Sequence, residues 1–300
     1  MRKSLLLTAV LGALYMPSVS FAAEEAAAAA PASPWTVTSN IGFTSDYYAR
    51  GVSQNWHRPA VQGGFDIAHA SGFYAGVWGS NVSPNTYPDA SVEIDVYGGY
   101  NGTISAVEGL GFTVGAIGYV YPGGSWKKYS YQNVPNQTPQ GGKWDTYEAN
   151  AGLSYKWLSA KASVTLGDWY GAETKTGWDG GTSGTTYLEL NAAYPLPWYG
   201  LTLVGHVGHL NVAGKLDLTV ASSANSLNED DPDFTDYKIG LSKSFAIAGS
   251  TGWNAGVYYV GADDTGYWSQ RGFGGASFNG NFETKDLVDN NWVFTLSRAF

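Results

Sequence analysis

The sequence predicts an all-β fold: a transmembrane, antiparallel, up-and-down barrel of about twelve strands. Apolar and polar side chains alternate with a period of two along most of the chain. The connections between these segments are alternately short and long, and charged residues make up only 14% of the chain. These patterns are typical of strands that face lipid on one side and water on the other, with long extracellular loops and short periplasmic turns.

The chain begins with the features of a secretory signal peptide over residues 1–22. Arg2 and Lys3 precede an apolar stretch that starts at Leu5, and Ala22 completes an A-x-A-like cleavage site. Residues 23–34 are rich in Ala and Pro and predict a flexible segment. We therefore expect an exported protein with a single barrel domain over residues 35–300. After the leader no apolar run reaches the ~18 residues of a transmembrane helix, so a membrane would be crossed by strands.

Alternation is clearest in four segments, residues 91–100, 146–157, 186–196 and 291–300. In the third, Leu188 and Leu190 share one face while Tyr187 and Glu189 share the other. Turn residues divide the whole chain into the following predicted strands: 36–48, 59–70, 72–82, 91–101, 110–121, 145–157, 159–169, 185–197, 201–212, 234–246, 252–262 and 288–300. An even number of strands would place both ends of the barrel on the side of the short turns.

A secreted β-sandwich would also alternate, with its apolar face turned inward. The polar faces here, however, are mostly Gly, Ser, Thr, Asn and Tyr, and Gly accounts for 40 of 300 residues. Cysteine is absent, so no disulfide can stabilise the fold. The net charge of −9 argues against nucleic acid as a partner. These observations favour the barrel, whose first and last strands must pair because an unpaired backbone is costly in hydrocarbon.

The stretch from Asn40 to Val82 carries a specific motif. S-D-Y is followed by R-G-x-S-Q, by P-A-x-Q-G-G and by S-G-F-Y-x-G-x-W-x-S-N. The matching residues are Ser45, Asp46, Tyr47, Arg50, Gly51, Ser53, Gln54, Pro59, Ala60, Gln62, Gly63, Gly64, Ser71, Gly72, Phe73, Tyr74, Gly76, Trp78, Ser80 and Asn81. This block resembles the N-terminal signature of the proteobacterial TorF porin family. The resemblance implies an outer-membrane barrel and a pore.

Polar residues on the faces opposite the apolar rows are candidates for lining the pore. They are Asp46, Arg50, Gln62, Asp66, Glu93, Asp95, Glu148, Lys156, Lys161, Glu189 and Lys238. Asp46 is expected within the first strand, facing the lumen, with Phe43 and Tyr47 facing lipid. Asp46 and Arg50 could create a constriction field or form an ion pair in the wall. Because acids outnumber bases in this set, we expect a mild preference for cations.

Aromatic residues gather near the predicted strand ends, where amphipathic rings suit a membrane interface. The expected lipid-interface aromatics are Trp35, Tyr121, Trp144, Trp157, Trp169, Trp198, Trp292 and Phe300. The final strand ending in Phe300 is the kind of segment that the barrel-insertion machinery reads. Arg298 departs from that pattern by taking an apolar slot, at a cost of roughly 0 to 1 kcal/mol near the membrane edge. Outer-membrane lipids and lipopolysaccharide are the other expected partners.

We expect no enzyme activity, cofactor or metal site. No G-x-S-x-G or H-E-x-x-H motif occurs, and His206 and His209 must point to opposite faces of one strand. The acidic run 228–236 lacks the spacing of a calcium loop and is predicted to be a solvated loop. Two functions stay open: a passive pore for small hydrophilic solutes or ions, and a non-conducting barrel that acts as an anchor or adhesin through its loops.

Overall fold

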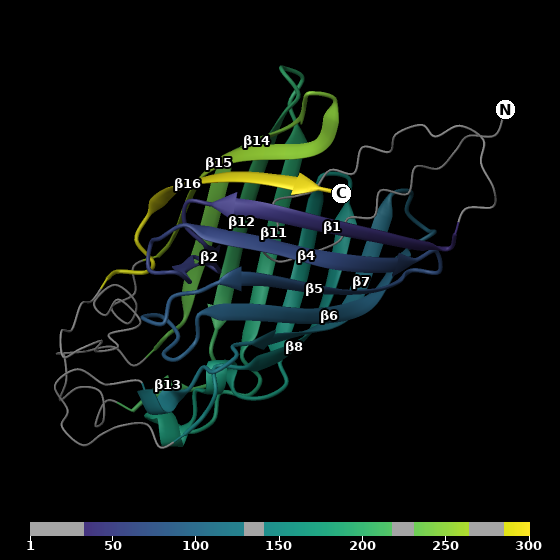
Figure 1. Ribbon diagram of the computed structural model, residues 1–300. Helices are drawn as coiled ribbons and strands as arrows, with labels where there is room; N and C mark the ends of the chain where they lie inside the picture. The colour runs from purple at the N-terminus through teal and green to yellow at the C-terminus, as the bar shows by residue number, and fades with distance from the viewer. Residues whose placement is uncertain (1–32, 129–140, 218–230, 264–284) are drawn as a thin grey trace.

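The computed structural model describes residues 33–128, 141–217, 231–263 and 285–300 (Figure 1). The predicted signal peptide, most of the segment 23–34 and the start of the acidic run 228–236 lie outside these residues. Within them, no helix is long and apolar enough to cross a membrane.

The described strands close into a barrel of twelve, all paired antiparallel. Its strands are β1 (Trp35–Thr44), β4 (Ala60–His69), β5 (Phe73–Asn81), β6 (Val92–Thr103), β7 (Leu110–Val120), β8 (Thr146–Tyr155), β9 (Leu158–Thr165), β11 (Thr186–Pro195), β12 (Leu201–Asn211), β14 (Phe234–Ile247), β15 (Ser250–Ala262) and β16 (Asn291–Ala299). The first and last strands pair directly, with Asn40 opposite Ala299 and Thr44 opposite Thr295. The predicted fold class is therefore confirmed.

The barrel has a short-turn end and a long-connection end. Every connection at the short-turn end is a tight turn or a short loop, and β1 starts and β16 finishes there (Figure 1). At the other end, the described parts of the long connections add the 3-10 helices η1 (Trp126–Lys128), η2 (Trp169–Gly171) and η3 (Thr174–Thr176), and the pair formed by β10 (Trp178–Asp179) and β13 (Lys215–Leu216).

Two predicted strands are shorter than expected at the long-connection end. β1 ends at Thr44, not at residue 48, and β9 ends at Thr165, not at residue 169. In each case the next residues leave the wall and become buried, as Tyr47 and Trp169 are only 3% and 5% exposed. The alternation of apolar and polar residues cannot distinguish the last residues of a strand from a loop that folds onto the inner wall.

The two faces of the wall differ in exposure as the alternation predicts. Val37, Phe65 and Leu188 point outward and are 68%, 64% and 57% exposed. The buried side chains form two main clusters near the long-connection end, one around Trp56 and Tyr187, the other around Tyr119 and Trp144. At this level the interior is therefore not lined by polar side chains alone, because aromatic side chains pack there.

Candidate functional site

Residues 45–58, here called the inner hairpin, connect β1 to β4 and fold into the barrel. Within them β2 (Tyr48–Ala49) pairs with β3 (Val52–Ser53). One side of the hairpin adds Tyr47 and Ala49 to the cluster around Trp144, and the other adds Val52 and Trp56 to the cluster around Tyr187. Trp56 is fully buried. The hairpin thus packs between the two clusters and narrows the bore at this level.

The tip of the hairpin is a two-residue turn. Arg50 and Gly51 both have positive φ, 48° and 74°, as a type I′ turn requires. A Cβ added to Gly51 would lie 2.5 Å from Asp236 Cβ and 3.1 Å from Ala262 Cβ. Glycine is required here for two reasons, the left-handed backbone and the close approach to β14 and β15.

Arg50 reaches across the barrel from this tip. Its Nη2 donates a 2.7 Å hydrogen bond to Glu148 Oε2, and its guanidinium lies 4.3 Å from the centre of the Tyr187 ring. The side chains of this ion pair are 7% and 1% exposed. Glu148 on β8 and Tyr187 on β11 belong to strands on the side of the barrel opposite β1. One side chain therefore ties the hairpin to the far wall.

A belt of paired charges continues around the inner wall from β9 to β14. Lys161 Nζ lies 2.7 Å from Glu189 Oε1, and these residues are directly opposite each other in the β9–β11 register. His206 Nε2 lies 2.9 Å from Asp236 Oδ1, and Tyr187 Oη donates to Asp236 Oδ2 at 2.8 Å. These carboxylates are almost fully buried, so each needs such a partner to offset the loss of water.

The opposite sector of the wall is acidic and aromatic. Glu93 and Asp95 on β6 are 1% and 4% exposed and share one face with Trp78 and Tyr119, the cross-strand neighbours of Asp95. Side-chain hydrogen bonds join Glu93 to Tyr121, Tyr47 and Asp95, and neither carboxyl group forms an ion pair among the described residues. The interior charge is therefore uneven: paired on one side and acidic on the other.

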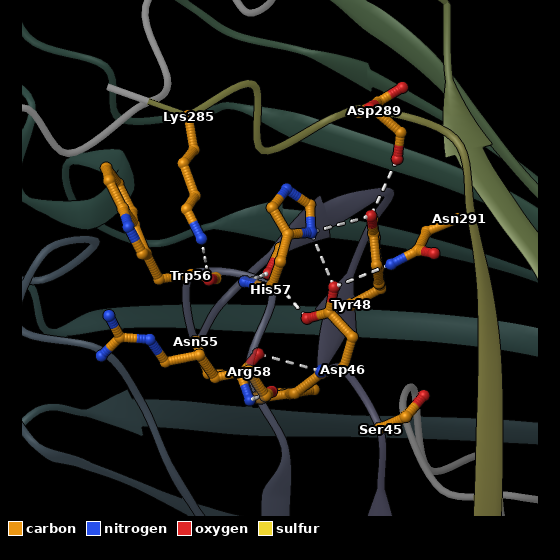
Figure 2. Close-up of polar contacts among 12 residues, drawn as sticks. Ser45, Asp46, Tyr48, Asn55, Trp56, His57, Arg58, Lys285, Asp289 and Asn291 are labelled. Carbon is orange, nitrogen blue, oxygen red and sulfur yellow. Dashed lines mark hydrogen bonds and ion pairs between the residues drawn. The ribbon is translucent and has the colours of Figure 1, made fainter. Parts of the chain in front are cut away.

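His57 anchors the base of the inner hairpin (Figure 2). Its Nδ1 lies 2.7 Å from Asp46 Oδ2, and its Nε2 lies 2.6 Å from the Asp286 carbonyl oxygen. Burial lowers the pKa of His57, but the hydrogen bonds to Asp46 and Asp286 outweigh burial and raise this pKa above its ordinary value. Ser53 Oγ donates to Asp46 Oδ1 at 2.7 Å, so Ser53 is not aligned for activation by the His57 ring.

Among the described residues, no group of three or more His, Cys, Asp or Glu side chains is arranged to hold a metal ion. The arrangement is instead that of a charged interior narrowed by the inner hairpin, with residues of other long connections packed against it.

Comparison with known families gives one full-length match. The family model described as "Bacterial protein of unknown function (Gcw_chp)" matches residues 28–300. The chain belongs to the Gcw_chp family. This description does not carry the TorF name, which stays a resemblance of the stretch 40–82. No curated protein matches this Gcw_chp chain.

Three solved structures with similar folds are distant from this Gcw_chp member. A KdgM porin in complex with disordered oligogalacturonate has a TM-score of 0.44 and 8% identity, over 88% of this chain and 99% of that one. A NanC porin has a TM-score of 0.42 and 11% identity, over 88% and 99%. The COG4313 outer membrane channel from Pseudomonas putida F1 has a TM-score of 0.42 and 12% identity, over 91% and 100%. At such low scores and identities these likenesses carry no functional argument.

Most of the predicted pore-lining residues point into the Gcw_chp barrel. Arg50, Glu148, Lys161, Glu189 and Lys238 lie in or beside the charged belt, with Lys238 Nζ 5.5 Å from the centre of the Tyr258 ring. Gln62 and Asp66 lie on β4, where Gln62 Nε2 donates to Ser80 Oγ and Asp66 Oδ1 accepts a 2.6 Å hydrogen bond from Tyr97 Oη.

Three expectations about polar residues are wrong. Lys156 is exposed in the tight turn after β8, with φ of 55°, because the strand ends one residue earlier. Asp46 lies beyond the end of β1, and it contacts His57 while Arg50 contacts Glu148, so these two residues form no ion pair with each other. Tyr47 faces the interior, not lipid, because it turns inward with the hairpin, whereas Phe43 is 47% exposed as expected.

Three of the expected lipid-interface aromatics are also misplaced. Tyr121, Trp144 and Trp169 are 2%, 0% and 5% exposed and are buried against the long connections. The remaining ones face outward: Trp35, Trp157, Trp198, Trp292 and Phe300 are 41% to 61% exposed. A ring near a strand end suits the interior of a filled barrel as well as a lipid interface, and its position in the sequence does not separate the two.

Sequence reasoning also missed several residues of the site. Asp236 could have been found, because it is two positions from Lys238 and so shares its face. The alternation predicts that Tyr187 is on the inner face, but it does not predict its contacts with Arg50 and Asp236. The contacts of His57 had no sequence signal, because its partner Asp286 is 229 positions away in another connection.

Proposed function

We propose that this chain is a porin-like channel of a bacterial outer membrane that passes small hydrophilic solutes or ions through a bore narrowed by the inner hairpin. The observation that carries the proposal is the opposite character of the two faces of one strand. On β11, Leu188 and Leu190 are 57% and 48% exposed on the outside, while Tyr187 and Glu189 are 1% and 6% exposed on the inside. An apolar outside and a charged inside suit a barrel that has lipid around it and a polar path within.

The outer surface supports a membrane location. Exposed Val, Leu, Ile and Phe side chains recur around the barrel, and removing such surface from water is worth about 25 cal/mol per Å². Trp35, Trp198 and Phe300 lie at the short-turn end, where amphipathic or aromatic rings would meet the lipid interface. Lipid and lipopolysaccharide would be the partners of this surface. The strand ending in Phe300 would be the segment presented to the insertion machinery.

The interior favours cations weakly. Glu93 and Asp95 on β6 add two carboxyl groups without an ion pair among the described residues, whereas Glu148 and Glu189 pair with Arg50 and Lys161. Carboxylates in a constriction attract cations and repel anions. Mild cation selectivity is therefore part of the proposal.

A second candidate function is a non-conducting barrel that serves as an anchor or adhesin. It is favoured by the inner hairpin, because Trp56 is completely buried and the hairpin packs between the two clusters of buried side chains. The two candidates differ in whether ions can pass the inner hairpin, so a conductance measurement distinguishes them.

The test is to reconstitute the purified, folded protein in planar bilayers and to compare it with a variant lacking residues 46–57. We expect small unitary conductance for the full chain, larger conductance for the deletion variant, and reversal potentials on the cation side. Failure of both proteins to conduct would refute the channel. Conductance by the deletion variant alone would support the anchor, and anion-side potentials would refute the selectivity.

A further inference from the structure

The inner hairpin is fastened to residues 285–291, the segment that leads into β16. The backbone N–H of Ser53 donates to the Leu287 carbonyl at 2.8 Å. Tyr48 Oη donates to the Asp289 carbonyl at 2.8 Å (Figure 2). The ring of His57 adds its contact to the Asp286 carbonyl. The position of the hairpin in the bore therefore depends on this junction between the first and last connections of the barrel.

Both nitrogens of the His57 ring face acceptors. Asp46 Oδ2 lies 2.7 Å from Nδ1, and the Asp286 carbonyl oxygen lies 2.6 Å from Nε2. Tyr48 Oη, 3.3 Å from Nδ1, is a further acceptor because its own proton goes to Asp289. A neutral imidazole has a single N–H and can satisfy only one side. The full set of contacts therefore requires the doubly protonated, cationic ring.

The charged groups around the ring favour that cation. Asp46 faces it from the hairpin, and the side chains of Asp286 and Asp289 lie on the segment before β16. Lys285 opposes them, but its Nζ donates to the Trp56 carbonyl at 3.3 Å and lies 5.9 Å from the centre of the Trp56 ring (Figure 2). Arg58, the next residue in the chain, is the other basic side chain drawn in this cluster (Figure 2). Burial alone would oppose the cation, so the nearby acceptors decide its charge.

We propose that protonated His57 is a pH-sensitive latch that holds the inner hairpin in the bore, so that conductance is low in acid and rises as His57 loses its proton. The proposal rests on the channel function above.

The direction follows from linkage between protonation and the latched state. A histidine whose pKa is raised by its contacts stabilises the latched state fully below its ordinary pKa of about 6.5 and loses that contribution as pH rises through the raised pKa. Between these two values, one proton changes the ratio of latched to free hairpin by up to about tenfold per pH unit.

Conductance against pH in planar bilayers tests the latch directly. We expect the wild-type conductance to rise with pH, with a midpoint above the ordinary histidine pKa of about 6.5. His57→Gln should conduct at low pH as the wild type does at high pH, with a flat profile. The matched controls are His69→Gln, half-buried beside Trp35 at the short-turn end, and His209→Gln, exposed on the outer face. Both should keep the wild-type profile. A wild-type profile in His57→Gln would overturn the latch.

A second measurement does not depend on conduction. In detergent micelles, histidine side-chain NMR should show one titration above the ordinary range that is missing in His57→Gln and moves to lower pH in Asp46→Asn. Hydrogen exchange of residues 46–56, corrected for its intrinsic pH dependence, should lose protection through the same titration in the wild type only. Protection that stays constant through it would overturn the latch. A silent bilayer with the expected titration and exchange would refute the channel while supporting the latch.

Discussion

Replacing Arg50 with Ala should release the inner hairpin. The change leaves Glu148, which is 1% exposed, buried without its ion-pair partner, and breaking such a pair costs about 3–5 kcal/mol. Loss of the contact with the Tyr187 ring adds roughly 0.5–2 kcal/mol. The backbone gains nothing, because Ala is no better suited than Arg to a φ of 48°. Since about 1.4 kcal/mol is tenfold in an equilibrium constant, the hairpin should open at least ~100-fold more often.

Hydrogen exchange read by mass spectrometry measures this opening. The amides of Ser53 and Gln54 bond to the carbonyls of Leu287 and Tyr47 at 2.8 and 2.7 Å and report on the packed hairpin. In Arg50→Ala their exchange should accelerate by about two orders of magnitude or more, in line with ~3 kcal/mol of lost local stability. Amides of the barrel strands should be unchanged, because their ladders do not depend on the tip.

The controls separate the ion pair from general damage. Lys156→Ala, in an exposed turn, should leave the hairpin as protected as in the wild type. The double replacement Arg50→Met with Glu148→Leu should recover most of the protection, because an apolar pair removes the stranded charge. If Arg50→Ala exchanges at the wild-type rate, or if the double variant is no better than the single one, the structural role given to this ion pair is refuted.

Three further predictions concern the tip of the inner hairpin and the two faces of the barrel wall. Gly51→Val should displace the hairpin and raise single-channel conductance, because its Cβ would overlap Asp236; unchanged conductance would contradict the packing of the tip. Leu190→Arg, on the outer face, should lower the free energy of unfolding in a bilayer by about 2–4 kcal/mol in urea titrations if this site is near the midplane, and no loss would argue against lipid contact. Glu189→Gln should leave Lys161 without its carboxylate and move the reversal potential toward anions; a shift toward cations would show that Lys161 does not act on the bore.

The strand architecture could be predicted because it depends on local patterns. Leu188 and Leu190 face outward and Tyr187 and Glu189 face inward for the same reason that the alternation is visible in the sequence: successive side chains of a strand point to opposite faces. The tight turns at the short-turn end fixed the strand count in the same way. The same rule also predicts one residue of the site: Asp236 is two positions from Lys238 and therefore lies on the same inner face of the strand.

The filled interior could not be predicted because it depends on contacts between distant segments. Trp144 and Trp169 look like interface rings in the sequence, yet the connections that carry them fold inward. Arg50 was expected beside Asp46, four positions away, but it bonds to Glu148, 98 positions away. The residue pattern around Arg50 and the pattern around Glu148 give no sign that these two side chains meet.

The sequence by itself determined a barrel with one apolar and one polar face, since these follow from side-chain period, turn spacing and the cost of an unpaired strand edge. Only the tertiary structure decided that residues 45–58 enter the bore, which charges pair there and that His57 lies between two acceptors. The physical reason is that neighbouring residues determine which way the side chains of a strand point. The position of an inward-folding loop instead depends on the shape and charge of a wall built from the whole chain.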